Sequence, residues 1–241
     1  MTRTRYTSDM LGLRESTLHR DLKSYYAYLH GGLIEETVCG YRIDVLVGRM
    51  AYEVQTKHFH KLRPKIETLL EGGYRVTVVY PIQGILEYRT AAGGHRKRRK
   101  KTSPAKAFEE LVYLAKLLPR EGLGVEILML HERATRRRSR RNRVRNTHLV
   151  AILERRSVES PVDLLGLLPS VIDSPFTTRD IMEQAGVGKL LAGRIAYTLH
   201  HAGLSERVGH RNRFVLYRMR DLDPDPGGEL GDPADPGPEP E

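Results

Sequence analysis

The sequence predicts an α/β fold over residues 1–132, and three observations predict it. Helix-like and strand-like patterns alternate along this stretch in the order αβββαβ. Two of the expected strands are separated by one tight turn, which joins them as a hairpin. Another expected strand is a nearly continuous run of β-branched residues, which is typical of a strand buried on both faces. Helices and strands that interleave in this way pack around one mixed sheet.

The first expected helix has good capping residues at both ends. Ser16 or Thr17 begins it, and Gly31 follows its last residue. Apolar side chains recur at helical spacing in this helix and in the next one, which Gly72 and Gly73 end. Strands are expected at residues 33–38, 41–47, 50–55, 75–80, 85–89 and 125–130, and helices at residues 17–30, 62–70 and 104–118.

A second ordered region is expected at residues 148–220. A helix is indicated at 161–168, and Thr177 or Thr178 begins another that Gly186 ends. A long amphipathic helix then leads to two strand-like segments around a basic loop. These last three elements are expected at residues 189–202, 205–208 and 214–218.

The charge of the chain is unevenly distributed. Residues 221–241 hold eight acids and six prolines but almost nothing apolar, which predicts a disordered tail. The formal net charge is +10, and without this tail it rises to +18 for residues 1–220. Phosphate backbones are the commonest large polyanions in a cell, so the sequence predicts binding to nucleic acid.

Other features of the composition bear on location. The single cysteine, Cys39, excludes an internal disulfide and a cysteine-based zinc cluster. No apolar run approaches the length that spans a bilayer, and the polar first residues show no signal-peptide pattern. We therefore expect a cytoplasmic protein with no membrane partner.

Two segments carry only positive charge. Residues 95–101 are expected to form a loop, and residues 133–147 an arginine-rich linker between two domains. An ordinary solvated face mixes both signs of charge, whereas neither segment contains an acid, so we expect both to contact phosphates. The expected contact residues are Arg96, Lys97, Arg98, Arg99, Lys100, Lys101, Arg136, Arg137, Arg138, Arg140 and Arg141.

Two acids occupy neighbouring expected strands. Asp44 lies in the strand at 41–47 and Glu53 in the strand at 50–55, so the hairpin brings them close together. Converging carboxylates suit a hard divalent cation such as Mg²⁺ or Mn²⁺, which completes its shell with water and phosphate. The alternative is a solvated or salt-bridged pair that holds no metal.

Further candidates lie beside these acids. Gln55 shares the face of Glu53, and Lys57 shares it too if the strand persists. Glu36 or Glu35, on the preceding strand, is expected to supply a third carboxylate to the metal.

Over residues 15–82 this pattern resembles the PD-(D/E)xK nuclease superfamily, which includes restriction endonucleases and Holliday-junction resolvases. The family core is αβββαβ, with an Asp on the second strand and (D/E)-x-K on the third. Asp44 and Glu53 match the acidic positions, whereas Gln55 stands where Lys is usual. The resemblance implies a restriction-endonuclease-like fold and Mg²⁺-dependent hydrolysis of DNA, on branched or otherwise structured substrates among others.

In this resemblance Asp44 and Glu53 hold the ion, and Gln55 or Lys57 orients the attacking water. A neutral amide cannot carry the positive charge of a lysine. The alternative is therefore a non-catalytic DNA-binding regulator or architectural protein with a degenerate nuclease fold.

Residues 176–219 resemble winged helix-turn-helix domains. The resemblance implies that residues 189–201 form a recognition helix, with Lys189 and Arg194 toward the groove. It also implies that Arg211 and Arg213 form the tip of the wing. The sequence does not separate DNA from RNA, and a homodimer stays open because related nucleases that cut both strands often pair.

Overall fold

The computed structural model describes residues 16–90, 94–138 and 143–221, and it begins with α1 (Thr17–His30). The side chain of Ser16 caps this helix by accepting a hydrogen bond, 3.2 Å long, from the backbone N–H of His19. Gly31 ends it with a φ of 65°, a left-handed conformation that glycine adopts without strain. The first predicted helix is therefore confirmed.

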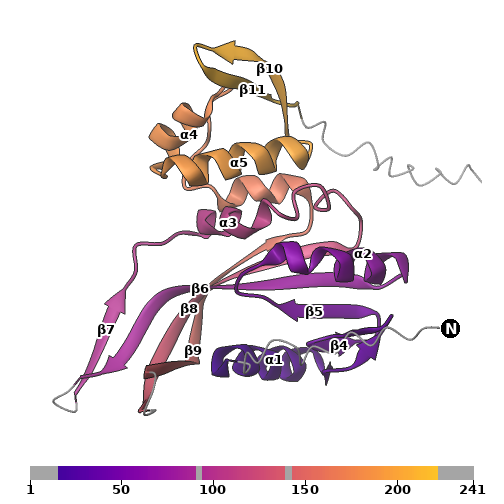
Figure 1. Cartoon of the computed structure of the whole chain (residues 1–241), viewed down its shortest axis with the longest axis vertical. Coiled ribbons are helices and arrows are strands. Elements are labelled where there is room, and N and C mark those ends of the chain that lie inside the picture. Colours follow the sequence, from indigo (N-terminus) through magenta and orange to yellow (C-terminus); the bar gives the residue numbers. More distant parts are fainter. Residues whose placement is uncertain (1–15, 91–93, 139–142, 222–241) are drawn as a thin grey trace, which may run out of the picture.

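A mixed sheet forms the centre of the molecule, and the described residues contribute seven strands to it (Figure 1). Its order is β1-β4-β5-β6-β8-β9, with β7 also paired to β6. β6 runs parallel to β5 and β8, and the other pairs are antiparallel, so the predicted mixed α/β class is confirmed. The strands are β1 (Leu33–Ile34), β4 (Val45–Val47), β5 (Met50–Val54), β6 (Arg75–Arg89), β7 (His95–Arg99), β8 (Leu123–Arg138) and β9 (Arg143–Val158).

Helices cover both faces of the sheet. On one face α1 packs the fully buried Leu22 and Tyr26 against apolar strand residues such as Val54 and Leu128. On the other face lie α2 (Arg63–Glu71), the turn η2 (Phe59–Lys61) before it, and α3 (Phe108–Leu111). The end of β5 therefore lies between helices of the two layers.

The helix predicted over residues 104–118 forms only in part. The turn η3 (Pro104–Ala107) leads into the four-residue α3, and tight turns follow. In these turns the backbone N–H of Leu114 donates to Leu111 O at 2.9 Å, and that of Leu117 donates to Leu114 O at 2.7 Å. Bonds of this i to i+3 kind wind the chain more tightly than an α-helix while keeping the leucines buried.

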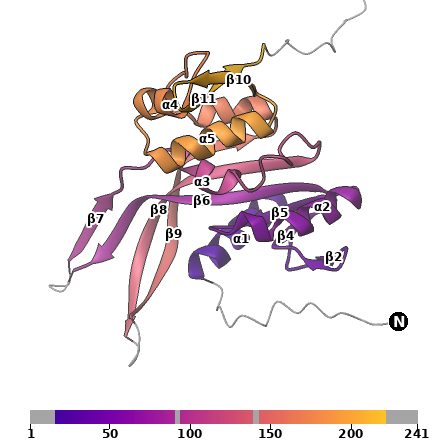
Figure 2. The same ribbon diagram turned by 45° about the horizontal axis from the view of Figure 1, so that its top comes forward.

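Long strands extend the sheet into an arm that projects from the rest of the molecule (Figures 1 and 2). β6, β8 and β9 have 15, 16 and 16 residues, and the two strands predicted at 75–80 and 85–89 are both part of β6. Register irregularities interrupt β6 near Gly84 and β8 near Leu130 and His131. Such bulges bend and twist strands, and here they lie where the arm begins.

Most described residues of the two basic segments predicted to be a loop and a linker lie in strands. Residues 95–99 form β7, which pairs antiparallel with β6. Residues 133–138 and 143–147 belong to β8 and β9, and β9 continues to Val158 inside the stretch predicted to be the second ordered region. Runs of charged residues lack the apolar alternation by which strands are recognised. Arg140 and Arg141 lie outside the described residues.

Among the described residues, two further pairs of strands lie outside the central sheet. β2 (Thr37–Val38) and β3 (Tyr41–Arg42) pair with each other beside the sheet. The C-terminal hairpin consists of β10 (Ser205–Arg211) and β11 (Phe214–Met219). Its turn is shorter than the predicted basic loop, so Arg211 lies within β10.

The C-terminal unit has three helical segments before its hairpin: η4 (Pro161–Leu167), α4 (Thr178–Ala185) and α5 (Lys189–His201). Thr177 caps α4 by accepting from the backbone N–H groups of Arg179 and Asp180, and Gly186 ends it with a φ of 61°. The apolar core of this unit is continuous with that on the α2 side of the sheet.

Of the predicted disordered tail, residues 222–241 lie outside the described residues, as do residues 1–15. In the part of the chain that the structure describes, no helix combines the length and apolar character needed to cross a membrane.

Candidate active site

Asp44 and Glu53 lie opposite each other at the open end of the β4–β5 hairpin. Val45 pairs with Tyr52 in the ladder, which places the two acids one position beyond that pair. The backbone N–H of Asp44 donates to Glu53 Oε1 at 3.3 Å. The structure thus brings the two predicted acids together.

The strand predicted at 41–47 is interrupted, because β3 ends at Arg42 and β4 begins at Val45. Asp44 therefore lies between two strands rather than within one. Its Oδ2 accepts a hydrogen bond of 2.9 Å from the backbone N–H of Val54, so its carboxylate ties the interruption to β5.

His19, on the first turn of α1, contacts the same carboxylate. Its Nε2 lies 3.0 Å from Asp44 Oδ2 and 2.8 Å from the carbonyl oxygen of Val54. Both partners are acceptors, so this nitrogen carries a proton and donates to them. Burial works against the charge of His19, but the hydrogen bond to Asp44 raises its pKa above the ordinary value.

Lys23 approaches the site one helical turn later. Its Nζ lies 2.6 Å from Glu35 Oε1 and 3.9 Å from Asp44 Oδ1, and the residue is only 3% exposed. Arg42 also contacts Glu35. Of the two glutamates predicted as a third carboxylate, Glu35 thus faces the site, with a φ of 64°, whereas Glu36 is exposed.

Lys65, on α2, reaches the site from the opposite layer. Its Nζ lies 2.5 Å from Glu53 Oε1, and both side chains are largely buried. The sequence pattern did not single out His19, Lys23 or Lys65, because each lies on a helix and meets the acids only through the fold. The one local signal was a pair of polar residues four positions apart, His19 and Lys23, beside the apolar positions of α1.

The two acids differ in their affinity for a proton. Burial, together with the negative charge of Asp44, raises the pKa of Glu53 to about 7, although Lys65 opposes the shift. Burial alone would also raise the pKa of Asp44, but hydrogen bonds from His19 and the Val54 N–H hold it below its ordinary value. A pair of acids with separated pKa values is typical of sites that move protons.

Gln55 and Lys57 lie beyond the end of β5. The Gln55 backbone N–H donates to Val79 O at 2.9 Å, and its side-chain amide donates to the Lys57 carbonyl. Lys57 is exposed in a turn, because the strand ends at Val54 and its alternation does not continue. The condition under which Lys57 shares the face of Glu53 is therefore not met.

A family model described as a domain of unknown function, DUF8091, matches residues 16–161. The chain belongs to the DUF8091 family. The matched part of this DUF8091 chain spans the strands of the central sheet and the residues around Asp44 and Glu53, and it ends at the beginning of η4. No curated protein and no solved structure matches the chain.

The DUF8091 site offers a limited set of metal ligands. Within residues 16–90, 94–138 and 143–221, no group of three or more His, Cys, Asp and Glu side chains is arranged to hold a metal ion. Mg²⁺ is usually bound by only one or two carboxylates together with water and substrate phosphate. Asp44 and Glu53 provide two carboxylates of this kind, and the carbonyl of Val54 lies beside them.

The predicted phosphate contacts lie mainly on the DUF8091 arm. Every residue of β7 is exposed, as are Lys100 and Lys101 after it. The acid nearest to this strand is withdrawn from the surface: Glu87 is 7% exposed and lies 3.0 Å from Arg133 Nε and 3.2 Å from His95 Nδ1. The exposed surface of β7 therefore carries positive charge alone.

The C-terminal unit presents fewer free cations than its sequence suggests. Arg194 donates from Nη1 to the carbonyl of Glu109 in α3 at 2.7 Å, so this side chain joins two parts of the molecule. Arg211 Nη1 lies 3.0 Å from Asp180 Oδ2 on α4. Lys189 and Arg213 are exposed, as the predicted contact role requires.

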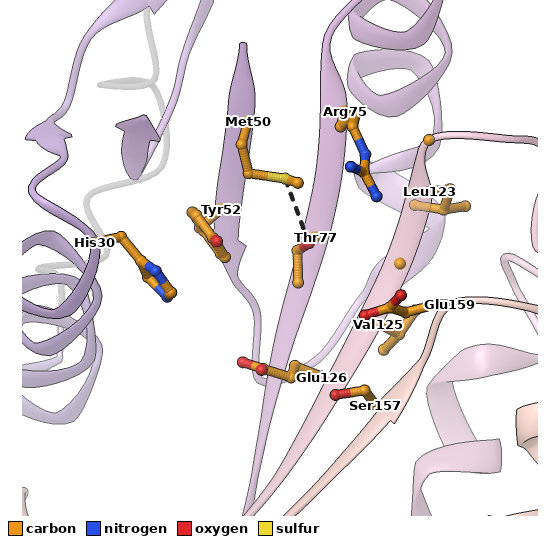
Figure 3. Close-up of a pocket in the computed structure, with 12 residues that line it drawn as sticks. His30, Met50, Tyr52, Arg75, Thr77, Leu123, Val125, Glu126, Ser157 and Glu159 are labelled. Carbon is orange, nitrogen blue, oxygen red and sulfur yellow. Dashed lines mark hydrogen bonds between the residues drawn. The ribbon is translucent and has the colours of Figure 1, made fainter. Parts of the chain in front are cut away.

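A pocket of about 160 Å³ lies on the α1 face of the DUF8091 sheet, beyond the end of that helix (Figure 3). The rings of His30 and Tyr52 stack at 4.9 Å along one side of it. Glu126 lines the other side and lies 2.9 Å from Arg155 Nη1. Asp44 and Glu53 do not line this pocket, so it is separate from the carboxylate pair.

Proposed function

We propose that this DUF8091 protein is a metal-dependent nuclease that hydrolyses phosphodiester bonds in DNA. The observation that carries the proposal is the Asp44–Glu53 pair, in which a half-buried and a buried carboxylate lie opposite each other among cationic side chains from both helical layers. The succession of α1, the β4–β5 hairpin, α2 and β6 around this pair supports a likeness to the PD-(D/E)xK fold.

The donors around the pair fit Mg²⁺ or Mn²⁺. Asp44 and Glu53 would hold the ion, since both offer the hard oxygen ligands that these cations take. A bound ion would polarise the scissile phosphate and lower the pKa of an attacking water. The raised pKa of Glu53 supports this assignment, because a carboxylate that resists ionisation in a crowded acidic site gains from a neighbouring cation.

Lys65 supplies the positive charge that Gln55 cannot. Its ammonium group lies beside Glu53, and the ion pair links α2 to the β4–β5 hairpin. A fixed positive charge at this place stabilises the negative charge that develops on a phosphate during hydrolysis. His19 acts through Asp44, whose carboxylate it orients by donating from Nε2.

A non-catalytic DNA-binding protein is the second candidate, and one observation favours it. Both carboxylates already have cationic partners, Lys65 for Glu53 and His19 for Asp44. If these partners are permanent, the cluster is a structural network and the basic arm is the functional part of the molecule.

A cleavage assay separates the two candidates. The full-length protein is incubated with plasmid, linear, single-stranded and branched DNA in Mg²⁺ or Mn²⁺, beside the variants Asp44→Asn and Glu53→Gln. Glu71→Gln is the matched control, because Glu71 is an exposed acid at the end of α2. We expect cleavage by the wild type and the control, with a loss of at least about 100-fold in both site variants.

Chelation of the metal should abolish the cleavage entirely. If the wild type binds these DNAs but cuts none of them in either metal, the nuclease proposal is overturned and the binding protein is the better account. Equal cleavage by Glu53→Gln and Glu71→Gln would show that Glu53 is not part of the catalytic site, although the protein cleaves DNA.

A further inference from the structure

The strand that carries Glu53 and the basic strand β7 lie on the same edge of β6. One edge of β6 is paired with β8 from Val76 to Tyr88. On the other edge β5 pairs with residues 75–79, and β7 pairs with residues 85–89. β6 therefore connects the carboxylate pair directly to β7, which lies on the arm (Figure 1).

The register sets the distance between the carboxylate pair and β7. Glu53 is opposite Val78 of β6, and Arg99, the last residue of β7, is opposite Ile85. Seven positions of β6, from Val78 to Ile85, thus separate Glu53 from the near end of β7. At roughly 3.3 Å per residue this distance is about 23 Å, and the far end of β7 lies about 36 Å from the same point.

The cations of β7 are not neutralised by the acid beside them. Lys97 is opposite Glu87, but that buried carboxylate is held by Arg133 at 3.0 Å and by His95 at 3.2 Å. In the part of the chain that the structure describes, no ion pair or hydrogen bond engages the side chains of six exposed cations: Arg96, Lys97, Arg98, Arg99, Lys100 and Lys101. Their charge is therefore available to a molecule that binds the arm.

A row of cations attracts a polyanion most strongly when the two lie parallel, because each charge then lies near an opposite one. One strand of a DNA duplex carries a phosphate for about every 3.4 Å of its axis, which is close to the spacing of residues along β7. The duplex is also stiff, with a persistence length of about 150 base pairs, so it keeps its direction from the arm to the carboxylate pair. A flexible single strand does not transmit a fixed spacing in this way.

We propose that β7 determines where the DNA is cut, by binding the backbone of a duplex at a fixed distance from the scissile bond. This rests on the proposed function and names its substrate class, which is DNA with a double-stranded flank beside the cut. At roughly 3.4 Å for each base pair, the distances along β6 place β7 about seven to eleven base pairs from that bond. A duplex of about 12 base pairs therefore reaches both the carboxylate pair and the whole of β7.

A radical probe beside the carboxylate pair tests this spacing without relying on nuclease activity. The parent protein for the test is the full-length chain with Cys39→Ser and Thr56→Cys, and it carries an iron–EDTA group on the new thiol. Thr56 is exposed two residues after the end of β5, and Cys39 is the single native cysteine. The tethered iron generates hydroxyl radicals that cut nearby DNA whether or not the protein hydrolyses it.

Two variants of the labelled parent lose the same number and kind of charges. The β7 variant carries Arg96→Gln, Arg98→Gln and Arg99→Gln. The control replaces three exposed arginines outside the arm by glutamine: Arg75, Arg120 and Arg156. All three proteins are titrated, without divalent metal, with duplexes shorter and longer than about 12 base pairs. Circular dichroism confirms that each protein folds.

We expect the affinity of the parent to rise with duplex length up to about 12 base pairs and then to level off, with the radical cuts at the ends of the duplex of that length. The β7 variant should lose the length dependence, and its radical cuts should spread along the duplex. Its slope of log affinity against log salt should fall by about three, at roughly 0.9 for each lost phosphate contact. The control should keep the cut positions of the parent.

Radical cuts in the middle of that duplex, identical cuts by the parent and the β7 variant, or a parent that does not bind duplex DNA would overturn the inference. So would a β7 variant that binds DNA normally but forms larger oligomers, since its charges would then only keep an exposed edge strand from pairing with other chains. Radical cuts at the ends without any hydrolysis in Mg²⁺ would refute the nuclease and keep the spacing. Hydrolysis in Mg²⁺ with evenly spread radical cuts would do the reverse.

Discussion

Glu53 is the more deeply buried acid of the carboxylate pair, and its protonation decides the charge of the site. It is 4% exposed, and burial and the charge of Asp44 raise its pKa to about 7. Lys65 Nζ, at 2.5 Å, opposes that shift. Loss of this lysine would therefore raise the pKa of Glu53 further, whereas a metal ion bound beside Glu53 would lower it.

Replacing Lys65 tests which side chain supplies the positive charge. We expect Lys65→Met to lower the cleavage rate by about 100-fold, because the site loses the only fixed charge beside Glu53 that the proposal assigns to phosphate stabilisation. Lys61→Met, on the neighbouring turn η2, should leave the rate unchanged. Single-turnover rates on plasmid DNA check both, with circular dichroism to confirm that each variant folds.

Gln55 gives the complementary prediction. Its amide donates to the carbonyl of Lys57, so it is turned along the chain rather than toward the acids. Gln55→Ala should therefore reduce the rate less than about 10-fold in the same assay. A loss as large as that of Lys65→Met would mean that Gln55 does act on the attacking water and that the assignment of Lys65 is wrong.

At the scale of the element, α1 links stability to the site. Its N-cap, Ser16, binds the backbone N–H of His19, and the side chain of His19 in turn orients Asp44. We expect Ser16→Ala to cost about 1 kcal/mol in the free energy of unfolding, as loss of a cap usually does. Urea denaturation of the full-length protein measures it.

The matched control is Ser24→Ala, which changes an exposed serine in the middle of the same helix. Alanine has the higher helix propensity there, so this variant should be as stable as the wild type or slightly more stable. If the two variants lose the same stability, the cap at Ser16 contributes nothing and the link between capping and His19 is broken.

The sequence predicted the elements that have apolar periodicity and failed where charge replaced it. The apolar spacing of α1 and the β-branched run of β6 located both elements, and the hairpin of β4 and β5 placed Asp44 near Glu53. β7 was missed because all five of its residues are basic. Lys65 was missed because its approach to Glu53 depends on how α2 packs, which no local pattern contains.

At the scale of the whole molecule, charge of one sign gathers on the arm and charge of the other in the tail. The arm exposes the basic strand β7, whereas residues 222–241 hold seven acids and no lysine or arginine. Opposite charges on one chain attract each other, the more so at low salt. We therefore expect a nucleic acid that binds the arm to compete with the tail.

Truncation after Asp221 should tighten binding to duplex DNA several-fold at low salt, with a smaller gain at higher salt because the competing attraction is screened. A full-length chain in which the tail acids are replaced by Asn and Gln should behave like the truncated one. Fluorescence anisotropy across a salt series measures all three proteins. Unchanged or weaker binding after truncation would show that the tail does not compete.

The proposed nuclease requires that Asp44 and Glu53 together hold a divalent cation for hydrolysis. Calorimetric titration of Mn²⁺ into the full-length protein tests it most directly, with Asp44→Asn, Glu53→Gln and Glu71→Gln titrated in parallel. We expect the wild type and Glu71→Gln to bind Mn²⁺ and both site variants to lose this binding. Identical Mn²⁺ binding by all four proteins, or no binding by the wild type with DNA absent or present, would contradict it.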